Sequence, residues 1–229
     1  MSDSPDTSTN TSNRTPLLLI GSGGHAKVLL EEFKDAWDFQ AVISDTVLSE
    51  DQTAYFNAQG LEVFVESDEL LNAFLSKNIT HAVVALGDNE IRLNIAESLL
   101  TRGFSIPGLI HPQALIASTA EISPVGVQIL AGSHVGASAS IGKHTILNHY
   151  AIVEHDAVVG DAVHVAPHAV VLGGASLASG SLLGANATIL PNVAVLATAC
   201  IGAGAVVNKD IDVAGVYVGV PIQPIYSVR

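Results

Sequence analysis

The sequence predicts two domains, an α/β domain with a parallel sheet followed by a parallel β-helix. Three observations support this order. Strand-like and helix-like segments alternate up to about residue 110, aliphatic residues then recur at every sixth position, and the composition changes between the two parts. All six Phe residues and the single Trp lie before residue 105, and no Asp, Glu, Lys or Arg occurs from residue 162 to residue 208. We therefore expect a disordered lead-in at residues 1–15, one domain at 16–110 and a second, with a C-terminal tail, at 111–229.

The composition excludes several classes of protein. Asp and Glu number 22 against 9 Lys and Arg, and this net charge of −13 argues against binding to nucleic acid or anionic membranes. A hydrophobic content of 48% with only 14% charged residues argues against a largely disordered chain. We expect no transmembrane segment and no secretory signal, because no long apolar run occurs. Cys200 is the only cysteine, which favours a reducing, cytoplasmic compartment.

The first part of the chain follows a βαβ pattern. An apolar run at residues 17–20 stops at the glycine-rich residues 21–24, and a helical pattern continues through residues 27–33. We expect further strands at 41–43, 61–65 and 82–86, and helices at 69–75 and 90–100. Strands that alternate with helices of this length are typical of a parallel sheet. This predicts a Rossmann-like domain.

The second part of the chain is a hexapeptide repeat. Every sixth residue from Ile129 to Val207 is Ile, Leu or Val, and the residue four positions after each is small or β-branched, as at Ser133 and Ala139. Three hexapeptides make one triangular coil, with aliphatic side chains inside and small ones at the corners, where aromatic rings would overfill the interior. A chance run in a Val-rich sandwich does not explain so many positions in phase. Because the β-helices of known hexapeptide proteins are left-handed, we predict a left-handed parallel β-helix.

Residues 21–26, with the sequence GSGGHA, predict a nucleotide-binding loop. They lie between a predicted strand and a predicted helix and match the loose pattern G-x-G-x-x-G/A. Glycines let the backbone approach a ligand, and a helix N-terminus attracts phosphate. Asp45 ends the next strand, where its carboxylate can accept hydrogen bonds from a ribose or a base. The alternative is a tight turn without a ligand. Because only about 90 residues precede the repeats, a single nucleotide such as the UDP of a nucleotide sugar fits better than NAD.

Histidines predict acid–base chemistry in the second domain. Seven of the nine lie in a region with few other ionisable groups, namely His111, His134, His144, His149, His155, His164 and His168. In Glu154-His155-Asp156 two carboxylates flank an imidazole, and a neighbouring carboxylate raises the basicity of the ring, as a general base requires. A solvated or structural position is the alternative for each histidine. His144 and His149 also have a metal-like spacing, but the early Arg of the β-helix zinc enzymes is missing, so we expect no metal.

In combination these motifs resemble the nucleotide-amino-sugar N-acetyltransferases of the bacillosamine and perosamine pathways, within the sialic-acid O-acetyltransferase superfamily. The resemblance covers about residues 16–225. It rests on the order of GSGGHA at 21–26, VISD at 42–45, LGDNEIR at 86–92, IHP at 110–112, LN at 147–148, VEHD at 153–156, HV at 164–165 and GVP at 219–221. It implies a homotrimer that transfers an acetyl group from acetyl-CoA to the 4-amine of a UDP-4-amino-4,6-dideoxy-N-acetylhexosamine, for glycan or glycoprotein biosynthesis.

The resemblance also implies roles for individual residues. It assigns His155 as the general base and Asp156, at a position where Glu is common, as its acidic neighbour. It places acetyl-CoA at His164, Gly173, Ala185 and Ala203. It places the nucleotide sugar at Gly23, Gly24, His25, Ser44, Asp45 and Gly87. Asn89 and Arg92 match a family stretch for which we expect only a structural role.

Several alternatives stay open at this point. Family members often carry two acids where this chain has Ser44-Asp45, so the choice between a UDP and a GDP sugar is undecided, as are the sugar epimer and the pathway. O-acetylation of a sialic or related sugar is an alternative within the same enzyme class. A trimeric scaffold with a non-catalytic nucleotide-binding module is an alternative from another class.

Overall fold

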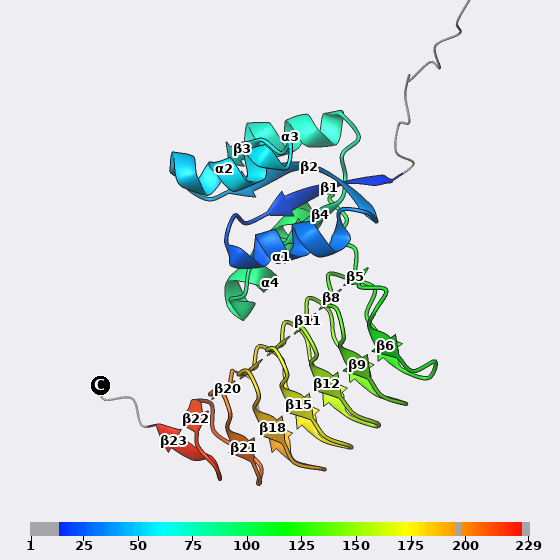
Figure 1. Cartoon of the computed structure of the whole chain (residues 1–229), viewed down its shortest axis with the longest axis vertical. Helices are drawn as coiled ribbons and strands as arrows, with labels where there is room; N and C mark the ends of the chain where they lie inside the picture. The colour runs from blue at the N-terminus through cyan, green and yellow to red at the C-terminus, as the bar shows by residue number, and fades with distance from the viewer. Residues whose placement is uncertain (1–13, 196–197, 226–229) are drawn as a thin grey trace, which may run out of the picture.

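The chain folds into an α/β domain that packs against the side of a β-helix (Figure 1). The structure, a computed structural model, describes residues 14–195 and 198–225. The predicted lead-in lies outside these residues up to residue 13. In Figure 1 the coils run from the green strand β5, close to the α/β domain, to the red C-terminal strands at the other end of the β-helix.

The N-terminal domain has a four-stranded parallel sheet in the order β3-β2-β1-β4. Its strands are β1 (Thr15–Ile20), β2 (Trp37–Ser44), β3 (Val63–Val65) and β4 (Ala82–Val84), and its helices are α1 (Gly24–Phe33), α2 (Glu50–Ala58), α3 (Asp68–Ser76) and α4 (Asn89–Thr101). Alternate residues of β1 enter two different apolar clusters, Leu17 with α1 and Leu18 with α3 and α4, because successive strand side chains point to opposite faces. Both faces are therefore covered, which confirms the Rossmann-like prediction. None of the helices described here is long and apolar enough to cross a membrane.

Three features of this domain differ from the sequence-based expectations. Helix α2 was not predicted, because Phe56 is its one buried residue and its apolar periodicity is weak; its capping box between Ser49 and Gln52 was the available signal. Strand β1 begins at Thr15, within the expected lead-in, because this residue pairs with Trp37. The β-helix begins before residue 111, since residues 109–110 form a strand that pairs with residues 128–129.

The second domain has three parallel faces, which we call faces I, II and III. Face I lies toward the N-terminal domain and contains β5 (Leu109–Ile110), β8 (Gln128–Ile129), β11 (Ile146–Leu147), β14 (His164–Val165), β17 (Leu182–Leu183), β20 (Cys200–Ile201), β22 (Val216–Val218) and the antiparallel β23 (Gln223–Ile225). Face II contains β6 (Leu115–Ile116), β9 (His134–Val135), β12 (Ile152–Val153), β15 (Val170–Val171), β18 (Thr188–Ile189) and β21 (Val206–Val207). Face III contains β7 (Glu121–Ile122), β10 (Ser140–Ile141), β13 (Val158–Val159), β16 (Ser176–Leu177) and β19 (Ala194–Val195).

Each coil uses 18 residues, three hexapeptides. His164 of β14, for example, pairs with Ile146 in one neighbouring coil and with Leu182 in the other. Every predicted inward position from Ile129 to Val207 is at most 2% exposed. The period of six therefore places one aliphatic side chain per face in the interior of each coil. The predicted left-handed parallel β-helix is confirmed.

The corners of the coils carry left-handed backbone conformations at the same 18-residue spacing. Three columns of positive φ run along the β-helix: Gly126, His144, Ala162, Gly180 and Thr198; Gly132, Tyr150, His168, Asn186 and Gly204; and Ser138, Asp156, Gly174 and Asn192. Positive φ favours Gly and, less strongly, Asn, Asp and His. The backbone therefore places His144, Asp156 and His168 on corners of the coils.

Candidate active site

His155 and Asp156 form a hydrogen-bonded pair on the corner that follows β12. The His155 Nδ1 atom lies 2.8 Å from Asp156 Oδ2, and the two side chains are 65% and 66% exposed. This hydrogen bond raises the pKa of His155 above its ordinary value, and the charges of Asp156 and Glu154 add to the effect. A ring that donates its Nδ1 proton to a carboxylate keeps Nε2 as the basic atom. The geometry therefore offers Nε2 of His155 as a proton acceptor.

Gly173 lies beside this basic atom, one coil further along. A Cβ atom built on Gly173 would lie 2.6 Å from Nε2 of His155, so a glycine is needed for the ring to rest there. Both residues line a surface groove of about 370 Å³, which Pro191 and Asn192 complete. One predicted acetyl-CoA position is thus brought together with the predicted base.

The predicted nucleotide residues converge at the carboxyl ends of β1, β2 and β4. Gly24 begins α1, and its neighbour Ser22 has its Oγ atom 3.2 Å from the buried Ser44 Oγ at the end of β2. Asp45 and Gly87 are exposed at the same edge. Ligands of open parallel sheets bind at this edge, and the amides of the first helical turn suit a diphosphate. The structure brings these residues together at one edge of the sheet.

His164 joins the two domains below this edge. Its Nε2 atom lies 3.1 Å from Asn148 Nδ2, and the ring also forms a hydrogen bond with the backbone of Gly87. Burial, reinforced by the charge of Arg92, lowers the pKa of His164 to about 4. The ring is therefore neutral at physiological pH and already engaged by partners from both domains.

The remaining predicted acetyl-CoA positions lie on a different corner from Gly173. Ala185 and Ala203 are one coil apart after β17 and β20, and the Gly204 amide donates to the Ala185 carbonyl oxygen over 2.8 Å. Gly173 follows β15 on face II. The predicted positions thus divide between two corners of one chain.

Arg92 holds the two domains together, a role that the sequence analysis did not predict. Its side chain is 1% exposed and donates to the carbonyl oxygens of His144 (2.9 Å) and Val163 (3.2 Å) in the β-helix. It also donates to the carbonyl oxygens of Leu86, Gly87 and Asp88 and to Oδ1 of Asn89. Burial lowers the pKa of Arg92 to about 10, which still leaves the guanidinium charged at neutral pH.

Asn89 extends this contact, since its Nδ2 atom donates to the carbonyl oxygens of Gly180 (3.2 Å) and Ser181 (2.9 Å). The family stretch that carries Asn89 and Arg92 therefore connects α4 to the coil segments that precede β11, β14 and β17. Its sequence signal was the motif itself, but the motif alone did not identify its partner.

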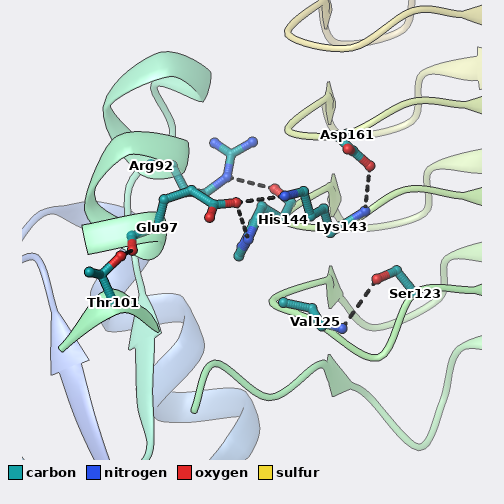
Figure 2. A network of polar contacts seen from close by, with 8 residues as sticks. All are labelled: Arg92, Glu97, Thr101, Ser123, Val125, Lys143, His144 and Asp161. Carbon is teal, nitrogen blue, oxygen red and sulfur yellow. Dashed lines mark hydrogen bonds and ion pairs between the residues drawn. The ribbon is translucent and has the colours of Figure 1, made fainter. Parts of the chain in front are cut away.

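Three other histidines, His144, His149 and His168, have structural partners. Figure 2 shows Lys143 and His144 of one corner turned toward Glu97 of α4, with Lys143 Nζ at 2.6 Å and His144 Nε2 at 3.8 Å from Glu97 Oε1. His149 pairs with Glu32 of α1 instead. The Tyr150 and His168 rings stack at 5.1 Å on the next corner. Across the described residues, no three His, Cys, Asp or Glu side chains gather as a metal-ion site.

A groove of about 500 Å³ runs between the domains, lined by Gly87 and Asn89 on one side and by Leu182 and Cys200 of face I on the other. It shares no lining residue with the groove at His155. In Figure 1 the strand β12, which leads to His155, lies on the side of the β-helix away from the α/β domain. A single chain therefore keeps the predicted base apart from the predicted nucleotide pocket.

Replacing Asp156 by Asn is expected to move the acidic limb of the pH–rate profile to lower pH. A general base must be unprotonated, so kcat/KM rises as pH passes the pKa of His155, which the Asp156 hydrogen bond holds above its ordinary value. Loss of that carboxylate lowers the pKa and weakens the base, so the plateau falls as well. The measurement is kcat/KM from pH 5 to 9, with Glu154→Gln as a control that removes only a smaller, through-space effect. Overlapping profiles for wild type and Asp156→Asn would show that Asp156 does not tune the base.

Comparisons with known proteins agree with this architecture. Residues 16–99 match the family model described as the PglD N-terminal domain. The chain is 30% identical to PerB from Caulobacter crescentus, solved in complex with CoA and GDP-perosamine, with 92% of this chain and 97% of that chain covered and a TM-score of 0.83. It is also 30% identical to the acetyltransferase domain of PglB from Neisseria gonorrhoeae, solved with acetyl coenzyme A, with 93% and 100% covered and a TM-score of 0.82. WeeI from Acinetobacter baumannii shares the fold at 23% identity, 92% and 100% coverage and a TM-score of 0.76.

A hexapeptide β-helix joined to a Rossmann-like α/β domain is the architecture of the acetyltransferase structures that this chain matches. With nearly the full length of two relatives matched at 30% identity, the chain belongs to the nucleotide-amino-sugar N-acetyltransferases. The predicted enzyme class, an acetyltransferase, is confirmed.

Proposed function

We propose that this enzyme transfers the acetyl group of acetyl-CoA to the 4-amino group of a UDP-4-amino-4,6-dideoxy-N-acetylhexosamine, giving a UDP-diacetamido sugar. The observation that carries the proposal is the His155–Asp156 pair, whose basic Nε2 atom borders an open groove beside Gly173. The relatives from C. crescentus and N. gonorrhoeae, solved with CoA or acetyl coenzyme A, support acetyl-CoA as the cosubstrate. The products of such an enzyme serve glycan or glycoprotein biosynthesis.

The chemistry needs one base and no covalent enzyme intermediate. The sugar amine attacks the thioester carbon, a carbon–nitrogen bond forms, and the amine proton passes to Nε2 of His155. The tetrahedral intermediate then collapses, the carbon–sulfur bond breaks, and coenzyme A leaves as its thiol after taking up a proton. Asp156 stabilises the imidazolium that exists between the two proton transfers.

The nucleotide is the finer part of the proposal. The sugar nucleotide occupies the edge formed by Gly23, Gly24, Ser44, Asp45 and Gly87, where the amides at the start of α1 meet the diphosphate. Ser44 is buried against Ser22, which leaves Asp45 as the exposed carboxylate that accepts hydrogen bonds from the base. A GDP sugar is the second candidate, because PerB was solved with GDP-perosamine.

A substrate panel tests the proposal. Purified enzyme and acetyl-CoA are mixed with UDP-4-amino-4,6-dideoxy-N-acetylglucosamine, its C4 epimer, GDP-perosamine and a free sialic acid, and products are identified by mass and fragmentation. We expect a gain of one acetyl group on the UDP-linked amine. Preferential turnover of GDP-perosamine would correct the nucleotide, acetylation of sialic acid would favour the O-acetyltransferase, and no product from any acceptor would favour the scaffold.

We further propose that three chains assemble and share active sites. Val158 on face III and Tyr150 and Leu115 on or beside face II are exposed apolar residues, and surface of this kind favours association. The separation of His155 from the nucleotide edge within one chain also supports a site that another chain completes. We expect a solution mass near three times 23.6 kDa. The lone cysteine and the need for acetyl-CoA support a cytoplasmic location.

Mixed assemblies test the shared site directly. His155→Ala and Gly24→Trp chains are each expected to be inactive, the first for lack of the base and the second for lack of the nucleotide pocket. The two variants are co-expressed with different tags and the mixed species is isolated. In it, the intact His155 of a Gly24→Trp chain lies beside the intact nucleotide pocket of a His155→Ala chain, so we expect part of the wild-type turnover to return. If the mixed species stays inactive while light scattering shows a trimer, each site lies within one chain.

A further inference from the structure

A chain of hydrogen bonds crosses the domain interface beside the predicted nucleotide pocket. His25 is the second residue of α1, directly after the glycine-rich loop, and its Nε2 atom lies 2.6 Å from Oε1 of Gln128 in β8 of face I. Nε2 of Gln128 in turn lies 2.8 Å from the carbonyl oxygen of Val84, the last residue of β4. Gln128 is only 1% exposed, so water does not compete for its amide.

This arrangement determines which nitrogen of His25 carries the proton. The Val84 carbonyl can only accept, so it requires the NH₂ group of the Gln128 amide. The other end of that amide is then a carbonyl oxygen, which also only accepts. His25 must therefore donate through Nε2, and a neutral ring that is protonated at Nε2 has an unprotonated Nδ1.

The surroundings keep the His25 ring neutral. Burial lowers the pKa of His25 and outweighs the hydrogen bond to Gln128, which raises it; the nearby charge of Arg92 from α4 acts in the same direction as burial. On the β-helix side His149 also lowers the pKa of His25, whereas Glu32 of α1 raises it. The Glu32 carboxylate is itself paired with His149. Within the described part of the chain, Nδ1 of His25 has no hydrogen-bond partner, so it remains an acceptor for a ligand.

We infer that Gln128 is a positioning residue that holds His25 as its Nε2–H tautomer, and that Nδ1 of His25 accepts a hydrogen bond from a hydroxyl group of the nucleotide sugar. The inference rests on the proposed nucleotide-sugar site. A hydroxyl group can donate a hydrogen bond to the unprotonated Nδ1 atom. A phosphate oxygen only accepts, so its lone pairs would face the lone pair of Nδ1. The amides at the start of α1 then bind the diphosphate, and His25 recognises a hydroxyl group of the hexose or of the ribose.

Nitrogen NMR of the histidine-labelled protein tests the tautomer without any substrate. Long-range ¹H–¹⁵N correlations, assigned with a His25→Gln variant, are expected to show a protonated Nε2 and an unprotonated Nδ1 at pH 7. Gln128→Met removes both hydrogen bonds at similar volume and should abolish this preference. Gln128→Glu should raise the pKa of His25 by more than one unit, because a buried carboxylate stabilises the imidazolium. The exposed Gln113→Glu, with the same change of charge, should alter neither result.

Calorimetric binding tests the ligand part, using the nucleotide series that the substrate panel selects. Gln128→Met should weaken nucleotide-sugar binding about tenfold and leave acetyl-CoA binding unchanged, as expected for one lost hydrogen bond. The free nucleoside diphosphate and its 2′-deoxy analogue separate the two hydroxyl sources. If Gln128→Met weakens binding of the free diphosphate as much as binding of the nucleotide sugar, but does not weaken binding of the 2′-deoxy analogue, the hydroxyl belongs to the ribose. If Gln128→Met weakens binding of the nucleotide sugar alone, the hydroxyl belongs to the hexose.

Two results would overturn the inference. One is an Nδ1–H or doubly protonated His25 in the wild-type protein at pH 7. The other is unchanged nucleotide-sugar binding in Gln128→Met although His25 has lost its tautomer preference. An inactive substrate panel with the expected tautomer and the expected binding effect would count against the proposed reaction alone.

Discussion

Replacing His155 by alanine is expected to lower kcat by roughly two to four orders of magnitude while the protein stays folded. The side chain is 65% exposed and makes its hydrogen bond with the neighbouring Asp156, so its loss removes no core contact. What disappears is the acceptor for the proton of the attacking amine. The measurement is steady-state kcat on the best acceptor of the panel, together with the thermal midpoint and solution mass of the variant.

His134→Ala is the matched control for this variant. His134 lies on face II in the preceding coil, where its strand pairs with Ile152, and it has no carboxylate partner among the described residues. We expect this control to keep near-normal turnover. If His155→Ala also retains near-normal turnover, His155 is not the base and another group must accept the amine proton.

Replacing Arg92 by methionine is expected to lower the free energy of unfolding by about 3 kcal/mol or more and to separate the two domains. The side chain is 1% exposed, and its loss removes the guanidinium donor from the buried carbonyl oxygens of His144 and Val163 and from the partly buried carbonyl oxygen of Leu86. The Val163 oxygen keeps a backbone donor from Ile146, whereas the His144 oxygen loses the donor that crosses from α4. Methionine keeps much of the volume, so the lost hydrogen bonds and not a cavity dominate the effect. Urea denaturation measures it, and a broadened or two-step transition would indicate uncoupled domains.

Arg102→Met is the control, because it removes the same charge from the surface. Arg102 forms an ion pair of 2.7 Å with Asp68, but the two side chains are 33% and 72% exposed. Exposed pairs of this kind contribute about 1 kcal/mol or less. Equal effects of the two substitutions would show that Arg92 contributes only its charge and does not hold the domains together.

The local patterns of the sequence were enough to predict most of the fold. A period of six with aliphatic residues specifies which side chains enter a coil, because each hexapeptide forms one side and one corner. All inward positions from Ile129 to Val207 are accordingly buried. Helix α2 was missed because Phe56 is its one buried residue, so its sequence carries almost no apolar periodicity.

The candidate site divides in the same way. The glycine-rich loop at residues 21–24 and the cluster around His155 were predictable because their members are close in sequence. Asn148, Gln128 and Arg92 gain their roles from partners 16, 103 and 52 residues away, and no local pattern encodes such pairs. His144, His149 and His164 look alike in the sequence, yet their partners are Glu97, Glu32 and the Gly87 backbone.

The sequence by itself thus determined the two folds, their order, the inward residues of the coils and the local motifs for base and nucleotide. Hydrophobic periodicity and turn-forming residues carry that information over short distances. Only the tertiary structure decided which histidines are buried, paired or exposed, that Arg92 connects the domains, and that one chain keeps His155 away from the nucleotide edge. Those properties depend on desolvation and on hydrogen-bond partners, which come into existence when distant segments pack together.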